Sequence, residues 1–327
     1  MGEDRMRTLK INLSYHCTAS CAHCRFGCTN EGPFQEPDIE TPYRVALRLK
    51  ERFGLDLAVL LGGEPSIFAE KSLTLLRNLH AAGIAVRVET NASWAGSPER
   101  AMAYLEPLRR LDANVMLSMD AFHEPFVPVE NLINAIRACV ALGVRYNLET
   151  PYLDPEGHAH PEDVRTDEIF REIQSSVDAK IPRYVGGTVF TGRAAVRFGD
   201  AFSKGKGVPA CTCEAVPWWM DGAIASTGLL IYEPGGWITK GCGIAIGNVF
   251  RQDLIEMLEG YDAGAHPIFS VLLREGPLGL ARMAQGRGYV LKPDYADKCH
   301  LCHEARQVLK PDYDQVLQPD QHYGIVG

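Results

Sequence analysis

Three cysteines near the start of the chain have a spacing that suits an iron–sulfur cluster. Cys17, Cys21 and Cys24 form a C-x-x-x-C-x-x-C pattern within one short stretch. A cubane [4Fe-4S] cluster normally takes four cysteines, so three protein ligands would leave one iron free for another ligand, as in an open catalytic metal site. A structural zinc site and disulfides are the alternatives. The pattern favours a cluster with one open iron.

A glycine-rich turn follows the next apolar segment. Residues 9–15 alternate apolar and polar side chains and predict a strand with one buried face, so the cysteines begin at a strand's end. Residues 55–61 predict a strand covered on both faces. That strand leads into Gly62, Gly63, Glu64 and Pro65. The glycines allow the backbone to approach a ligand, the glutamate can accept from an ammonium group, and the proline fixes the turn.

Together these two motifs resemble the radical S-adenosylmethionine (SAM) superfamily. The resemblance implies that Cys17, Cys21 and Cys24 hold a [4Fe-4S] cluster whose open iron is chelated by SAM. It implies that residues 62–65 hold the amino group of SAM. It also implies reductive cleavage of SAM to a 5'-deoxyadenosyl radical, which takes a hydrogen atom from a substrate.

The segments that follow alternate between helix and strand patterns. We expect helices at about 41–53, 67–82, 98–111, 129–142 and 163–177, and strands at about 84–89, 114–119, 144–148 and 182–190. Such units build a parallel sheet with ligands at the carboxyl ends of its strands. The predicted fold class is α/β: a partial (β/α)6 TIM-like barrel over residues 1–200, binding the cluster and SAM, followed by a smaller cysteine-rich α+β domain over 201–327.

Polar residues at the predicted strand ends are further site candidates. By position they resemble the family's SAM contacts, which would here be Thr90, Asn91, Ser118 and Asp120, with Arg193 contacting SAM or substrate. The alternative is that such residues satisfy loop backbone groups. His123 and Glu124 are candidate acid–base groups, although a capping role would also explain the histidine. Cys28 is either a catalytic thiol facing the substrate or a spectator.

A second group of cysteines lies in the C-terminal third. Residues 229–232 and 237–239 flank a turn and predict a hairpin. The cysteines around it are Cys211, Cys213, Cys242, Cys299 and Cys302. This arrangement resembles the twitch variant of the SPASM domain, which carries one auxiliary [4Fe-4S] cluster. The resemblance implies that Cys242, Cys299 and Cys302 are ligands together with Cys211 or Cys213; if both of the latter bind, Cys242 is not needed.

Haem attachment and zinc binding are the competing interpretations of this second group. Cys299, Cys302 and His303 match a c-type haem attachment pattern, but that chemistry requires an exported chain. A zinc knuckle built from Cys211, Cys213, Cys299 and Cys302 is the stronger alternative. Cys139 falls inside a predicted helix and is interpreted as a core residue.

Composition limits the classes of partner. The chain has 327 residues, of which 46% are hydrophobic and 23% charged, and a formal net charge of -8. The negative charge argues against binding to nucleic acid or to an acidic membrane. No apolar run approaches the roughly 18 residues of a membrane span, and the polar N-terminus is unlike a secretory signal. We therefore expect a cytoplasmic protein whose ten cysteines are metal ligands more readily than disulfides.

The combined expectation is a radical SAM oxidoreductase or peptide-modifying enzyme. It would oxidise a small molecule or mature a ribosomal peptide, with an external reductant such as a flavodoxin or ferredoxin. The chain starts about eight residues before its first predicted strand, which predicts no fused leader-peptide-binding domain. The alternatives are an epimerase in which Cys28 or Cys139 returns a hydrogen atom, and a non-catalytic iron–sulfur electron carrier.

Overall fold

The computed structural model describes residues 7–32, 35–154, 156–157, 160–213 and 229–324. Its strands are β1 Thr8–Asn12, β2 Leu57–Leu61, β3 Ala85–Thr90, β4 Asn114–Ser118, β5 Tyr146–Tyr152, β6 Arg183–Gly187, β7 Leu229–Glu233, β8 Trp237–Thr239 and β9 Ala245–Asn248. Its α-helices are α1 Glu40–Phe53, α2 Ala69–Ala81, α3 Pro98–Arg110, α4 Val129–Leu142, α5 Pro161–Ser176, α6 Arg193–Phe198, α9 Leu254–Glu259, α10 Phe269–Gln285 and α11 Lys298–Leu309. Among the described residues, η1 Pro65–Phe68 and η3 Asp320–Tyr323 are 3-10 helices.

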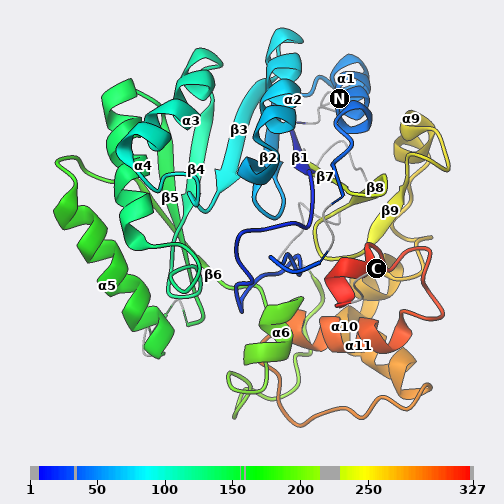
Figure 1. Ribbon diagram of the computed structural model, residues 1–327. Coiled ribbons are helices and arrows are strands. Elements are labelled where there is room, and N and C mark those ends of the chain that lie inside the picture. The colour runs from blue at the N-terminus through cyan, green and yellow to red at the C-terminus, as the bar shows by residue number, and fades with distance from the viewer. Residues whose placement is uncertain (1–6, 33–34, 155, 158–159, 214–228, 325–327) are drawn as a thin grey trace.

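The strands of the described residues form one open sheet in the order β6-β5-β4-β3-β2-β1-β7-β8-β9. Strands β1 to β6 are parallel, and helices α1 to α5 lie along the outer side of the curved strands (Figure 1). This confirms the predicted α/β partial barrel. Most element boundaries agree with the sequence patterns, but β5 continues through Glu149 and Thr150, which were expected to follow the strand.

The predicted hairpin is present as the antiparallel pair β7 and β8. Strand β7 pairs in parallel with β1, with Leu9 opposite Leu230, so the hairpin extends the barrel sheet. Sequence patterns did not predict β9, α6, α9 or α10. Helix α10 contains Gly276, whose φ of 65° breaks the helical backbone just before Pro277, and this interruption hid the helix in the sequence. The domain division at residue 200 stays a prediction.

The buried apolar side chains of the described residues form two large hydrophobic cores and one small cluster. The larger core packs the barrel strands against α1 to α5 and also includes Leu230 and Ile238 of the hairpin. The smaller core includes Phe269 of α10 and Leu301 of α11, and α11 also contacts α6. A third, small cluster joins the first cysteine loop to apolar side chains of later segments. Among the described residues, no helix has the length and apolar character needed to span a bilayer.

Candidate metal centres

The first cysteine loop folds back on itself at the carboxyl end of β1. The Cys17 amide donates to the Thr29 carbonyl at 2.8 Å, and the Thr29 amide donates to the Tyr15 carbonyl at 3.1 Å, which closes the base of the loop. The cavity at this end of the barrel encloses about 260 Å³. Four cysteines line it: Cys17, Cys21, Cys24 and Cys28. The three predicted cluster ligands therefore converge on one cavity, with a fourth thiol beside them.

The loop already favours a thiolate at Cys24. A hydrogen bond from Cys28 and the nearby charge of Arg193 hold the pKa of Cys24 well below its usual value, although burial opposes this. The same hydrogen bond, together with burial, raises the pKa of Cys28. Burial raises the pKa of Cys17, and the nearby Glu64 carboxylate adds to the effect. Thiolates are the form of cysteine that binds iron. The loop therefore favours Cys24 as a metal ligand, with Cys28 as its hydrogen-bond donor.

Arg193 holds the cysteine loop in shape. Its Nε donates to the Cys21 carbonyl at 3.0 Å, its Nη2 donates to the Cys28 carbonyl, and its amide donates to the Cys24 carbonyl at 3.2 Å. It directly follows Gly192, where φ is 55° and a Cβ would lie 2.6 Å from the Arg25 carbonyl. Arg193 was expected to contact SAM or substrate. It does line the cavity, but its hydrogen bonds go to the loop backbone.

The two glycines after β2 let the backbone approach the cysteine loop. A Cβ on Gly63 would lie 1.6 Å from the His16 carbonyl oxygen, and Gly62 has a φ of 144°. The Gly63 amide donates to the Ser14 carbonyl at 2.6 Å, and the Glu64 amide donates to the His16 carbonyl at 2.7 Å. Side chains at these glycines would displace the loop. Their first role is therefore to hold the cysteines against β2, and both also line the cavity.

Glu64 organises the end of β3 and does not line the cavity. Its buried carboxylate accepts from Thr90 Oγ1 at 2.8 Å and from the Asn91 amide at 2.9 Å. Burial raises its pKa, although these hydrogen bonds oppose the shift. Asn91 Nδ2 in turn donates to the Cys17 sulfur at 3.7 Å. Six of the predicted SAM contacts do line the cavity: Gly62, Gly63, Thr90, Asn91, Ser118 and Arg193. That Glu64 meets an ammonium group directly stays a prediction, as does the role of Pro65, which starts η1.

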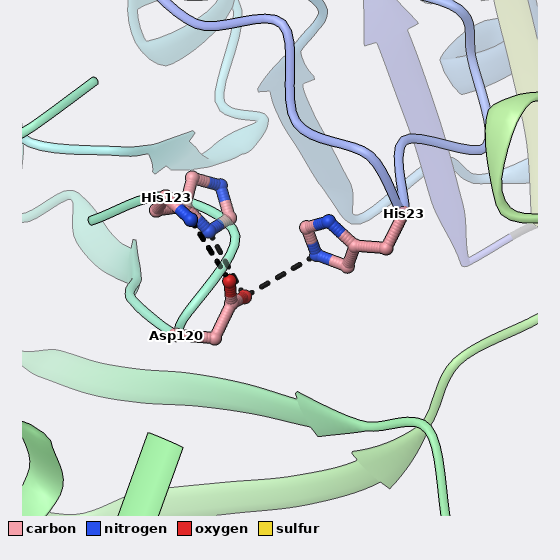
Figure 2. Close-up of side chains that lie close together, drawn as sticks. All are labelled: His23, Asp120 and His123. Atoms are coloured by element: carbon pink, nitrogen blue, oxygen red, sulfur yellow. Dashed lines mark hydrogen bonds and ion pairs between the residues drawn. The ribbon is translucent and has the colours of Figure 1, made fainter. Parts of the chain in front are cut away.

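A fully buried carboxylate after β4 joins two histidines (Figure 2). Asp120 Oδ2 lies 2.9 Å from His123 Nδ1 and 3.2 Å from His23 Nε2. Burial opposes ionisation of Asp120, but the two imidazoles outweigh it and hold its pKa well below the usual range. Asp120 in turn raises the pKa of His123 against the effect of burial. Both histidines line the cavity, whereas Asp120 stands behind them.

His23 was missed by sequence reasoning. The sequence feature that could have identified it is its position between Cys21 and Cys24, which places His23 at the cavity. Glu124, considered as an acid–base group, instead pairs with Arg165, whose Nε donates to it at 2.9 Å.

The second group of cysteines is gathered from three separate segments. Cys213 and Cys242 pack against the smaller core, which contains Cys302 of α11. Burial, and then the charges of Cys302 and Cys242, raise the pKa of Cys213 to about 12. Burial likewise raises the pKa of Cys242 to about 11. The pKa of Cys299 is raised by burial, with contributions from Asp297 and the other three thiols. These contributions, and the packing of three of the thiols in or against one core, place the four thiols near one another.

Cys211 differs from this group in its exposure. Its side chain is exposed, and its carbonyl oxygen would lie only 2.1 Å from a Cβ on Gly276. The geometry therefore favours Cys213 over Cys211 as the fourth ligand. The zinc knuckle that used both residues loses support for the same reason.

Buried donors surround the second group and fit an anionic cluster. Arg306 is fully buried, and its Nη1 donates to the Cys242 carbonyl at 2.5 Å and to Tyr323 Oη at 2.7 Å. Among the described residues, Arg306 Nε and His303 Nε2 are buried without a hydrogen-bond partner. Burial and the charge of Arg306 lower the pKa of His303 to about 3. Sulfur atoms of a thiolate-ligated cluster are acceptors that such donors can satisfy.

The two cysteine regions meet at a buried glutamate. Glu233 Oε2 accepts from Asn12 Nδ2 at 2.8 Å and from Tyr15 Oη at 2.9 Å, on the side of the first loop. Its other oxygen accepts from Thr239 Oγ1 at 3.2 Å and lies 3.1 Å from His322 Nε2. Burial opposes its ionisation, but these partners outweigh burial and lower its pKa.

Comparison with known proteins places the barrel in a family. The family model described as Radical SAM superfamily matches residues 11–189, which is more than half of the chain. The chain belongs to the radical SAM superfamily. This confirms the family prediction made from the two motifs. Members of the superfamily use a [4Fe-4S] cluster and SAM, which confirms that pair of cofactors at the level of the family.

The individual proteins that resemble this chain are distant in sequence. YydG of Bacillus subtilis (strain 168), a protein named for peptide biosynthesis, is 23% identical over 133 residues, which are 40% of this chain and 41% of the relative. The chain thus spans less than half of that relative. The solved structure of tagged anSMEcpe with bound AdoMet has a TM-score of 0.52 and 14% identity, covering 95% of this chain and 98% of that one. It supports the fold along almost the whole chain. SuiB of Streptococcus suis, solved with the precursor peptide SuiA, has a TM-score of 0.45 and 13% identity, covering 98% and 76%.

Proposed function

We propose that this protein is a radical SAM enzyme in which Cys17, Cys21 and Cys24 hold the catalytic [4Fe-4S] cluster. The observation that carries the proposal is the convergence of these thiols on one cavity whose other walls are the glycine turn and polar strand ends. When bound there, the cluster and SAM supply a 5'-deoxyadenosyl radical that abstracts a hydrogen atom from the substrate. An external reductant such as a flavodoxin or ferredoxin provides the electron.

The chain's own residues would prepare this site in three ways. Arg193 fixes the loop backbone and favours the Cys24 thiolate. Glu64 holds Thr90 and Asn91 at the cavity wall, where they can bind SAM together with Gly62, Gly63 and Ser118. Asp120 orients His23 and His123, which also face the cavity, from behind. We assign His123 as the candidate acid–base group on this geometry.

We further propose that Cys213, Cys242, Cys299 and Cys302 hold an auxiliary [4Fe-4S] cluster. Their proximity at the smaller core and the buried donors around them support this ligand set. Four cysteines cover all four irons, so the cluster would have no open site for substrate. Its role would then be to accept one electron from the substrate radical, which also loses a proton, so that the substrate is oxidised by two electrons overall.

A peptide is the proposed substrate class, with oxidation of a small molecule as the other outcome. The name of YydG supports a peptide. The structure adds that β6, an edge strand of the described sheet, exposes 60% of Tyr184 and 47% of Val185. Its last residue, Gly187, and the two that follow line the cavity. An extended peptide can pair with such an edge through its backbone, and one paired with β6 would lead into the cavity.

A second candidate function is epimerisation. The observation in its favour is that the Cys28 thiol lines the cavity, where it could return a hydrogen atom to a substrate radical. Cys139, the other thiol considered, is completely buried in the barrel core. For an epimerase, Cys28→Ala should leave hydrogen abstraction intact and prevent formation of the epimerised product.

The formation of 5'-deoxyadenosine tests the proposal directly. The anaerobically purified protein is incubated with dithionite and SAM, and the product is quantified by chromatography. We expect 5'-deoxyadenosine from the wild type and from Cys28→Ser, and none from Cys24→Ser. A protein that contains both clusters but releases no 5'-deoxyadenosine would instead be an electron carrier.

A further inference from the structure

Arg25 belongs to the first cysteine loop but reaches the second cysteine region. It directly follows Cys24 and lines the cavity. Its Nη2 lies 3.2 Å from the position that a Cβ on Gly241 would take, next to Cys242. The absence of a side chain at Gly241, where φ is 89°, leaves room for this approach. One guanidinium therefore borders both proposed metal centres.

The guanidinium of Arg25 places a positive charge at this boundary. On the cavity side this charge, together with that of Lys10, favours the ionised form of Glu149, although burial and the nearby Glu89 carboxylate raise the pKa of Glu149 overall. None of the ion pairs found in the described part of the chain includes Arg25, so no carboxylate bridge neutralises this charge within that part. Its buried Nε has no hydrogen-bond partner there either.

Aromatic packing holds Arg25 at this position. Its guanidinium carbon lies 4.7 Å from the centroid of the Phe26 ring. Phe26 in turn meets His322 edge to face, with centroids 5.4 Å apart. His322 is the residue that pairs with Glu233. Arg25 is thus supported by the C-terminal region, although it belongs to the first loop.

We propose that Arg25 is a tuning residue shared by the two centres, which raises the reduction potential of the auxiliary cluster from its place at the wall of the SAM cavity. This inference rests on the proposed auxiliary cluster. Adding an electron makes a thiolate-ligated cluster more negative, and a fixed positive charge nearby stabilises that reduced state. Arg25 would therefore make the auxiliary cluster a better acceptor for an electron from a substrate radical formed in the cavity.

The test is a potentiometric titration of the holoenzyme followed by EPR. The auxiliary signal is identified as the one absent from Cys302→Ser. For Arg25→Met we expect the reduced-to-oxidised ratio of this cluster, at fixed potential, to fall about tenfold, which is about 59 mV for a one-electron centre. Arg25→Lys keeps the charge. The potential of its auxiliary cluster should therefore lie between those of Arg25→Met and the wild type. Arg48→Met removes an equal charge from an exposed pair with Asp253 and should cause no shift.

Iron counting separates the ways in which this test can fail. An unchanged auxiliary potential in Arg25→Met with about eight irons per chain overturns the role of Arg25 and leaves the auxiliary cluster intact. About four irons in the wild type would instead overturn the auxiliary cluster itself. If Arg25→Met does not retain both clusters, Arg25→Gln gives the same comparison, because it also removes the charge but keeps a polar side chain.

Discussion

The two cysteine regions differ in how the chain builds them. The first is one loop, in which Cys17, Cys21 and Cys24 are neighbours in sequence and face a cavity. The second collects Cys213, Cys242 and the two cysteines of α11 from segments up to 89 residues apart, and packs them against a hydrophobic core. A local loop can leave one metal position open to a ligand, whereas a site enclosed by packing is suited to a closed cluster.

An arginine fixes the cysteine backbone in both regions. Arg193 donates to carbonyls of the first loop and also lines the cavity. Arg306 donates to the Cys242 carbonyl and is completely buried. The same side chain type therefore serves an open site in one region and an enclosed site in the other. The two proposed clusters therefore differ less in the type of their protein ligands than in how accessible their irons are to a further ligand.

The largest expected effect comes from removing one ligand from each region. Cys24→Ser and Cys302→Ser should each lower the iron content from about eight to about four per chain, because a cubane cluster contains four irons. Only Cys24→Ser should abolish 5'-deoxyadenosine formation, since only the first cluster binds SAM. Metal analysis and the chromatographic assay measure the two outcomes. Equal loss of 5'-deoxyadenosine in both variants would remove the distinction between the regions.

A matched pair of cysteines sharpens the ligand assignment in the second region. Cys213→Ser should lose about four irons, because its thiol interacts with those of Cys242 and Cys302. Cys211→Ser should retain all of them, because that side chain is exposed. Iron counting on the two purified variants provides the comparison. The reverse result would transfer the ligand role to Cys211.

Sequence reasoning succeeded where a feature depends on local spacing. The βα alternation, the cysteine loop and the glycine turn were all predicted, because short-range patterns specify strands, helices and turns. It could not show that Gly63 meets the His16 carbonyl, or that Glu64 faces Thr90, because these contacts join parts of the chain that are distant in sequence. Nor could it choose between Cys211 and Cys213, because that choice depends on how the segment that contains Cys211 passes Gly276 of α10.

Glu233 joins the two regions, so its replacement should affect their stability together. Glu233→Gln removes a buried charge that pairs with His322 and accepts hydrogen bonds from Asn12 and Tyr15. We expect it to lower the free energy of unfolding by about 3 kcal/mol. Its pKa is lowered in the folded state, so its contribution is fully present above the unfolded value of about 4.3 and is lost as the pH falls further. Thermal unfolding of both proteins should therefore show a difference that shrinks as the pH falls below about 4.3.

The outcome for Glu233→Gln bears on the comparison itself. A Tm equal to that of the wild type would mean that the two regions are held together elsewhere. Asn12→Ala is a useful companion variant, because it removes one donor from the side of the first loop and leaves the glutamate paired with His322.

The smallest effect is expected at a cysteine that belongs to neither region. Cys139 is completely buried in α4, and burial raises its pKa to about 12, so it is a neutral thiol at physiological pH. Cys139→Ala should lower the free energy of unfolding by about 1 kcal/mol and leave the iron content unchanged. Chemical denaturation and iron counting measure these values. Loss of iron in this variant would extend metal binding beyond the two cysteine groups.

The EPR spectrum of the reduced first cluster tests the central claim most directly. Cys302→Ser is expected to retain only that cluster, which is reduced with dithionite and measured with and without SAM. We predict that SAM changes the spectrum, because it binds the iron that Cys17, Cys21 and Cys24 leave open. A spectrum that SAM leaves unchanged, or zinc in place of iron at these cysteines, would contradict the account.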